Sequence, residues 1–293
     1  MINPGKSRHL IKIFFLISRM IKIEHSVFAL PFAYIGCFWA AGGWPGTRVF
    51  IALTLAMVAI RSLAMTANRV IDLDIDRKNP RTQSRALVTG DVSRRDAWAF
   101  IAVCAGIFVL CCAFLNSTCL LLSFPAMLWA MGYSLSKRYT RLCHFILGSV
   151  LGLAPIAGWL AYEASWHLAY ICLFLGVLFW VAGFDILYSA QDCEFDREHG
   201  LHSMPASIGV PCAFTISSFS HVNAVLFLGL AGLLAEAGLF FFAAWGLTSI
   251  ILLWEHKIIA ADDLSRVNTA FFTLNGIISL VLFGGVLADI FVA

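Results

Sequence analysis

Residues 68–82 read NRVIDLDIDRKNPRT, a charged stretch that directly follows a long apolar run. In a helix, side chains four positions apart lie on one face. A continuous helix would therefore align Asn68, Asp72 and Asp76 and turn Asp74 away from them. A row of carboxylates at the end of a membrane helix is costly unless a cation is bound there. Oxygen ligands favour a hard ion, so the stretch predicts a Mg²⁺ site.

A second stretch repeats this pattern. Residues 185–198 read DILYSAQDCEFDRE and also follow an apolar run. Asp192 and Asp196 are again four residues apart, and each follows its counterpart in the first stretch by 120 residues. Two carboxylate pairs can hold two Mg²⁺ ions, and two such ions suit one diphosphate. A solvated helix end would explain one charged stretch, but two with matched spacing favour a binding site.

The composition restricts the class of protein. Of the 293 residues, 60% are hydrophobic and 13% are charged. Repeated long apolar runs predict an all-α, polytopic membrane protein, and we expect one domain over residues 1–293. The net charge of +3 gives no indication of nucleic-acid binding. The nine cysteines are odd in number and lie mostly in apolar runs, which is typical of buried hydrophobic residues rather than of disulfides or zinc ligands.

The apolar runs define the expected spans. Residues 1–22 carry five Lys and Arg residues among isoleucines and phenylalanines, which predicts an amphipathic helix at the membrane interface. About nine transmembrane helices in one bundle should follow, near residues 25–42, 48–70, 96–114, 118–136, 144–162, 167–190, 210–234, 238–258 and 267–289.

The distribution of basic residues predicts the orientation. With these spans, eighteen of the twenty Lys and Arg residues lie on one side, while Arg48 lies on the other and Arg61 lies within a span. Cytoplasmic loops are enriched in Lys and Arg. We therefore expect an integral protein of the bacterial inner membrane, with its N-terminus and both Asp-rich stretches in the cytoplasm.

Two further charged residues lie deeper in the spans. Arg61 is seven residues before Asn68 and shares its helical face, and Asp185, Tyr188 and Asp192 share a face of a second span. Arg61 and Asp185 either form a structural ion pair or contribute to a site. Phosphate binding needs cations, and Arg makes bidentate contacts. The candidate bases near the two stretches are Arg69, Lys78, Arg81, Arg85, Lys137, Arg138 and Arg197, of which Arg81 and Arg85 form the preferred pair.

These motifs resemble the UbiA superfamily of intramembrane prenyltransferases. The resemblance rests on Asn68, Arg69, Asp72 and Asp76 together with Asp192 and Asp196, and the nine-span layout extends it over nearly the whole chain. Family members commonly carry an Arg seven residues before the motif Asn, a Tyr four residues before the second motif and a basic pair after the fourth span. Arg61, Tyr188 and the pair Lys137 and Arg138 match these positions. Within the superfamily the chain looks most like 4-hydroxybenzoate polyprenyltransferases.

The resemblance implies a Mg²⁺-dependent reaction. Two Mg²⁺ ions bound by Asn68, Asp72, Asp76, Asp192 and Asp196 would hold a polyprenyl diphosphate, with Tyr188 and the basic residues at the same site. Preorganised cations stabilise the diphosphate as it leaves. The allylic cation would then alkylate an aromatic acid in quinone biosynthesis. Arg61 or the cytoplasmic bases would bind the carboxylate of that acid, and Asp185 would hold the acceptor or take a proton.

Three alternatives remain open at the level of sequence. The acceptor could be 4-hydroxybenzoate, or it could be 1,4-dihydroxy-6-naphthoate on a route to menaquinone. Paired Asp motifs in a membrane bundle are also compatible with a divalent-cation transporter. The outer half of the spans carries few acidic residues, which argues against an ion path across the membrane.

Overall fold

The computed structural model describes residues 13–21, 29–259, 263–264, 266–267 and 270–292. In these ranges the chain is helical, and eight helices are long and apolar enough to cross a membrane. The chain also contains a shorter apolar helix, α2 (Leu30–Ala41). The predicted all-α, polytopic membrane bundle is therefore confirmed. The span expected at 25–42 begins in residues that lie outside the described ranges.

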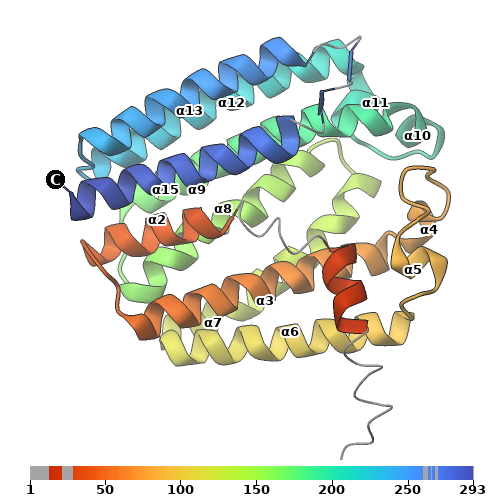
Figure 1. The fold of residues 1–293 in the computed structure, drawn as a ribbon. Helices are drawn as coiled ribbons and strands as arrows, with labels where there is room; N and C mark the ends of the chain where they lie inside the picture. Colours follow the sequence, from red (N-terminus) through yellow and green to blue (C-terminus); the bar gives the residue numbers. More distant parts are fainter. Residues whose placement is uncertain (1–12, 22–28, 260–262, 265, 268–269, 293) are drawn as a thin grey trace, which may run out of the picture.

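The long helices run roughly parallel or antiparallel to one another (Figure 1). They are α3 (Thr47–Ile71), α6 (Arg94–Leu115), α7 (Ser117–Gly132), α8 (Cys143–Tyr162), α9 (Leu168–Ser189), α12 (Val210–Leu234), α13 (Leu239–Ile258) and α15 (Asn275–Phe291). A short 3₁₀ helix, η2 (Tyr133–Arg138), continues α7, and a π-helical turn, η4 (Ala270–Leu274), precedes α15. Helix α9 packs against both α8 and α12, which makes it central to the bundle.

Small residues allow the helices next to the cavity to approach closely. A Cβ atom added at Gly36 of α2 would lie 2.1 Å from the carbonyl oxygen of Pro155 in α8. One added at Gly158 of α8 would lie 1.8 Å from the carbonyl oxygen of Ala33. Close backbone contact of this kind is how membrane helices pack, because burial of apolar surface provides little driving force inside lipid. Any side chain at either glycine would force α2 and α8 apart.

The short helices gather at one end of the bundle (Figure 1). They are α4 (Leu73–Asp76) and α5 (Ala86–Thr89), which follow α3, and η3 (Ala190–Asp192), α10 (Cys193–Glu198) and α11 (Met204–Ile208), which follow α9. We call this the motif end, because both Asp-rich stretches lie there.

The continuous helix expected over residues 68–76 is interrupted. Helix α3 ends at Ile71, and Asp72 has φ −91° and ψ 7°, outside the regular helical region. Asp192 has nearly the same conformation, with φ −103° and ψ 8°, where η3 meets α10. This sparsely populated region is frequent among active-site residues. Hydrogen bonds from the Asp72 N–H to Asn68 O and from the Asp76 N–H to Asp72 O nevertheless carry the helical course across the break.

Part of the predicted N-terminal helix is described. Residues 13–20 are helical, and Ile17 and Ile21 are buried in a cluster with Leu73, Leu87 and Val92 at the motif end. The rest of the predicted helix over 1–22 lies outside the described residues. This segment therefore packs against the loop that follows the first Asp-rich stretch.

Candidate active site

A cavity of about 880 Å³ opens among the helices at the motif end. Twelve of the predicted site residues line it: Arg61, Asn68, Arg69, Asp72, Asp76, Arg81, Arg85, Lys137, Arg138, Asp185, Tyr188 and Asp192. They come from α3, α4, η2, α9, η3 and the loop over residues 77–85. Two stretches 120 residues apart in the sequence thus form a single site.

The deeper wall of the cavity is largely apolar. It includes Met57 and Ile60 of α3, Phe108 of α6, Ala130 of α7 and Leu151 of α8. Charged side chains occupy the motif end, while hydrocarbon side chains continue between the transmembrane helices. This division suits a ligand with an anionic head and an apolar tail.

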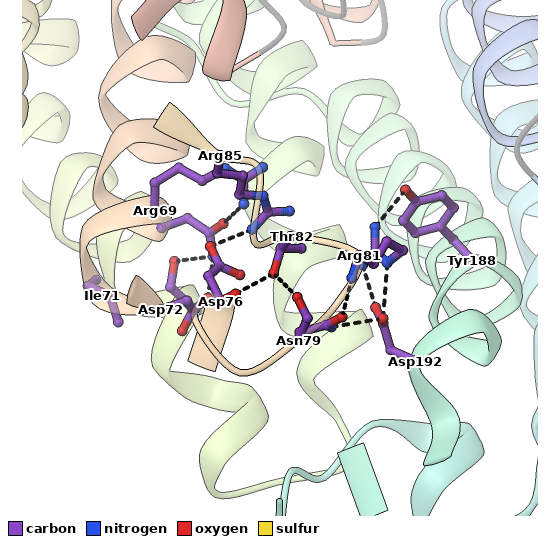
Figure 2. Close-up of polar contacts among 12 residues, drawn as sticks. Arg69, Ile71, Asp72, Asp76, Asn79, Arg81, Thr82, Arg85, Tyr188 and Asp192 are labelled. Atoms are coloured by element: carbon purple, nitrogen blue, oxygen red, sulfur yellow. Dashed lines mark hydrogen bonds and ion pairs between the residues drawn. The ribbon is translucent and has the colours of Figure 1, made fainter. Parts of the chain in front are cut away.

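The first Asp-rich stretch is held at the end of α3 (Figure 2). The Asn68 side-chain amide donates to Asp72 Oδ2 at 2.8 Å and to Ser134 Oγ at 3.2 Å. Arg69 Nη1 donates to Asn68 Oδ1 at 2.7 Å. Asp76, which is 6% exposed, forms a 2.5 Å ion pair with Arg85 Nη1. The break at Asp72 therefore leaves the carboxylates oriented by amide and guanidinium groups.

The loop after α4 connects the two Asp-rich stretches. Arg81 binds Asp192 in a bidentate fashion, with Nε donating to Oδ1 at 3.0 Å and Nη2 donating to Oδ2 (Figure 2). Arg81 Nη1 also donates to Tyr188 Oη at 3.3 Å. Asn79 supports this arrangement, because its amide donates to Asp192 Oδ1 at 3.1 Å while its own Oδ1 accepts from the Arg81 N–H at 2.9 Å. The loop of the first stretch thus supplies the cationic partner of the second.

Two adjacent basic residues of the short helix η2 form ion pairs with one stretch each. Lys137 Nζ lies 2.7 Å from Asp196 Oδ1. Arg138 Nη2 donates to the carbonyl oxygen of Ile71 at 2.6 Å and lies 3.3 Å from Asp72 Oδ1. Each of the four motif carboxylates therefore has its own basic partner.

Burial and ion pairing shift the charge states at the site in different directions. Burial raises the pKa of the Asp72 carboxyl, and the hydrogen bond from Arg138 offsets this only in part. Burial by itself would lower the pKa of Arg81, but its hydrogen bonds and charge interaction with Asp192 raise that pKa above its ordinary value. Arg81 is thus firmly charged, while an added cation would stabilise the charged form of Asp72.

The donor atoms of the motif fit a hard divalent cation. Asp196 is completely buried, and its Oδ2 has no hydrogen-bond partner among the described residues. Within those residues no three His, Cys, Asp or Glu side chains converge as a ready-made metal cluster. Mg²⁺ does not require one, because it is usually held by one or two carboxylates together with water and substrate phosphates. The carboxylate oxygens of Asp72, Asp76 and Asp192 at the cavity wall fit that description.

Asp185 lies deeper in the cavity and contacts a histidine. Its Oδ2 is 2.7 Å from His144 Nδ1, and both residues line the cavity, as does Arg61. The partner of Asp185 in the structure is thus His144 of α8 rather than the Arg61 considered from the sequence. Arg61 and Asp185 both line the cavity.

Three predicted residues lie away from the cavity lining. Lys78 and Arg197 are exposed to solvent and are absent from the cavity wall. Lys78 follows α4 and Arg197 lies within α10, and in each segment the buried acid is Asp76 or Asp196. Asp196 itself is also behind the lining and faces Lys137. The geometry gives Lys78 and Arg197 no direct role at the cavity.

Asn79, Ser134 and His144 were missed as site residues by sequence reasoning. Asn79 is part of the quoted stretch and precedes Pro80 and Arg81, so its position in a turn gave a usable signal. Ser134 and His144 had no such signal, because their importance depends on which helices pack against α3 and α9.

The comparisons with known proteins agree with this geometry. Residues 29–277 match the model of the UbiA prenyltransferase family. A 4-hydroxybenzoate octaprenyltransferase of Nitrosomonas eutropha is 28% identical over 261 residues, covering 87% of this chain and 88% of the relative. A protein of the same name from Providencia stuartii is 27% identical and covers 92% of this chain and 94% of the relative.

Solved structures show the same fold. The apo structure of a UbiA homolog from Aeropyrum pernix K1 has a TM-score of 0.83 and 35% identity, covering 91% of this chain and 98% of that one. A UbiA homolog from Archaeoglobus fulgidus bound to DMAPP and Mg²⁺ has a TM-score of 0.73 at 22% identity, covering 94% of this chain and 99% of that one.

The family match extends from α2 to the start of α15 and includes both Asp-rich stretches. Family membership assigns prenyl transfer rather than ion transport, so the transporter alternative loses its basis. The chain is an integral-membrane polyprenyltransferase of the UbiA prenyltransferase family.

Proposed function

We propose that this enzyme transfers a polyprenyl group from a polyprenyl diphosphate to 4-hydroxybenzoate in a Mg²⁺-dependent reaction. The observation that carries the proposal is the joining of both Asp-rich stretches, through Arg81 and Asp192, at the polar end of a largely apolar cavity. The names of the curated relatives support 4-hydroxybenzoate as acceptor. The Archaeoglobus fulgidus protein bound to DMAPP and Mg²⁺ supports the donor class and the metal.

The basic residues are placed to exchange one anionic partner for another when substrate binds. In the structure Arg81, Arg85, Lys137 and Arg138 neutralise the motif carboxylates. Bound Mg²⁺, held by Asn68, Asp72, Asp76, Asp192 and Asp196 and most simply as two ions, would supply further positive charge to the diphosphate. With the carboxylates holding the metal, the guanidinium and ammonium groups that now pair with them would be able to contact phosphate oxygens.

The reaction breaks one bond and forms another inside the cavity. The C1–O bond of the allylic diphosphate breaks as negative charge builds on the leaving group, which Arg81 and Arg138 are placed to stabilise. C1 then bonds to a ring carbon of the acceptor, and that carbon loses its proton. The apolar wall of the cavity keeps water from the reactive allylic carbon.

The orientation of the enzyme also forms part of the proposal. The motif end carries most of the basic residues, and basic loops are retained in the cytoplasm. We place the site at the cytoplasmic face of a bacterial inner membrane, with the N-terminus on the same side. Accessibility labelling of Cys193, which is partly exposed near the motif end, tests this in intact cells against inverted vesicles.

The reaction is tested with the full-length protein in membranes or detergent. A labelled polyprenyl diphosphate is supplied with Mg²⁺ and, in parallel, with 4-hydroxybenzoate or 1,4-dihydroxy-6-naphthoate. We expect prenylated 4-hydroxybenzoate, lost on chelation with EDTA and in Asp192→Asn. If only the naphthoate is prenylated, the proposed acceptor is wrong, while the proposed donor class and metal requirement stand. Turnover unaffected by EDTA would contradict the metal requirement.

A further inference from the structure

The contact between His144 and Asp185 is built into the deep part of the cavity. His144 is 2% exposed and lies in the first turn of α8, whereas the Asp185 side chain on α9 is 23% exposed. His144 Nδ1 lies 2.7 Å from Oδ2 of the Asp185 carboxylate. This contact uses Oδ2, so Oδ1 is left to interact with a ligand in the cavity.

The hydrogen bonds assign the tautomer of His144. Its Nε2 accepts from the backbone N–H of Met204 at 3.0 Å. Met204 is the first residue of α11, where backbone N–H groups lack an intrahelical partner, and Ser203 provides no side-chain cap. Because Nε2 accepts, the neutral ring carries its proton on Nδ1 and donates it to Asp185. The imidazole is thereby fixed from both sides, and its contact with Oδ2 orients the Asp185 side chain.

The depth of Asp185 matches that of Arg61. Asp185 lies seven residues before Asp192 on α9, and Arg61 lies seven residues before Asn68 on α3. At 1.5 Å per residue, each is about 10 Å deeper than its motif residue. Both line the cavity, so an anionic and a cationic group occupy the same level beneath the diphosphate-binding residues.

We propose that His144 is a positioning residue that selects acceptors bearing a ring hydroxyl, an inference that rests on the proposed function. By donating to Oδ2, His144 orients the Asp185 side chain, so that Oδ1 accepts a hydrogen bond from the acceptor hydroxyl. Arg61, which lines the same cavity, would contact the carboxylate of the same acceptor. A carboxylate held in this way can only accept, so an aromatic acid without a donor group leaves it unpaired and is rejected.

Two substitutions separate the two contacts of His144. His144→Asn places an amide nitrogen where Nδ1 lies, so the donor to Asp185 is kept and the acceptor for Met204 is lost. His144→Gln places its amide where Nε2 lies, so the acceptor for Met204 is kept and the donor to Asp185 is lost. A merely structural role for His144 would make the two variants equally impaired.

The readout is binding of 4-hydroxybenzoate and of benzoate to the purified full chain, measured by titration calorimetry, together with the KM for each substrate. We expect His144→Gln to weaken 4-hydroxybenzoate binding about tenfold or more, since a hydrogen bond to a charged group is lost. Benzoate binding and the KM for the prenyl diphosphate should stay within about twofold of wild type. His144→Asn should retain most of the preference for the hydroxylated acid.

Equal weakening of both acids in both variants, or no change in His144→Gln, would overturn the proposal. If the His144 variants do not purify in folded form, Asp185→Asn carries the test. It should reduce the preference for 4-hydroxybenzoate over benzoate, and an unchanged preference overturns the role of the pair. A wild-type enzyme that binds the diphosphate with Mg²⁺ but binds neither 4-hydroxybenzoate nor the dihydroxynaphthoate would instead reject the proposed acceptor class as a whole.

Discussion

The two Asp-rich stretches have the same backbone form but different surroundings. Asp72 and Asp192 both lie at a break between helices, with φ and ψ values that differ by little. The Asp72 side chain is 22% exposed and lies 3.3 Å from Arg138, whereas Asp192 is 10% exposed and is bound in a bidentate fashion by Arg81. A repeated spacing therefore produces two similar helix breaks, and the partners from other segments leave Asp72 of the first stretch partly open and hold Asp192 of the second stretch tightly.

The largest expected effect is loss of activity when either stretch loses a carboxylate. Asp72→Asn and Asp192→Asn should each lower kcat/KM by about a hundredfold or more, the range seen when one electrostatic contact to a transition state is removed. Steady-state kinetics over a range of Mg²⁺ concentrations measures this. Asp192→Asn should also loosen the loop that carries Arg81. A variant that retains near-wild-type activity would show that its stretch is dispensable.

Arg81 distinguishes the held stretch from the open one. Arg81→Lys keeps the charge but loses the bidentate contact with Asp192, and Lys does not replace Arg at such sites. We expect the KM for the polyprenyl diphosphate to rise about tenfold. Arg94→Lys is the matched control, because Arg94 lies on the exposed surface. Similar kinetics for the two variants would argue against a bridging role for Arg81.

Lys137 and Arg138 allow the two stretches to be compared in terms of stability. Lys137→Met leaves Asp196 completely buried without its cationic partner, whereas Arg138→Met affects the partly exposed Asp72. Removing one partner of a fully buried pair costs about 3–5 kcal/mol, and because Lys137 is partly exposed we expect a smaller cost of about 1–2 kcal/mol. Thermal unfolding in detergent should show a lower Tm for Lys137→Met than for Arg138→Met. The reverse order would mean that the second stretch is not the more tightly held.

The smallest effect is expected at the outward-facing acids of the two stretches. Asp74 and Glu194 each lie two residues after the central aspartate, and both are exposed. The surface pairs of Asp74 with Arg77 and Arg94 contribute at most about 1 kcal/mol. Asp74→Asn and Glu194→Gln should both leave kcat/KM within about twofold of wild type. A large loss in either would extend the site to the outer face of the helix.

Local sequence patterns predicted the individual parts of this site well. The apolar runs predicted the transmembrane helices, and the four-residue spacings identified carboxylates that lie together at the motif end. Spacing did not predict the breaks at Asp72 and Asp192, because ideal helical periodicity assumes unbroken backbone geometry. The charge of Lys78 and Arg197 marked them as candidates, but charge alone does not determine which face of a short helix points inward.

By itself the sequence determined that this is a helical membrane protein with two carboxylate stretches on one side, because hydrophobicity and helical spacing are local properties. Only the tertiary structure decided that Arg81 binds Asp192, that Lys137 and Arg138 serve opposite stretches, and that His144 rather than Arg61 contacts Asp185. The paired residues lie 41 to 111 positions apart in the sequence. Lys137 and Arg138 are neighbours in the sequence, yet they pair with different stretches. They depend on how α3, α8 and α9 pack, which no local pattern in the sequence records.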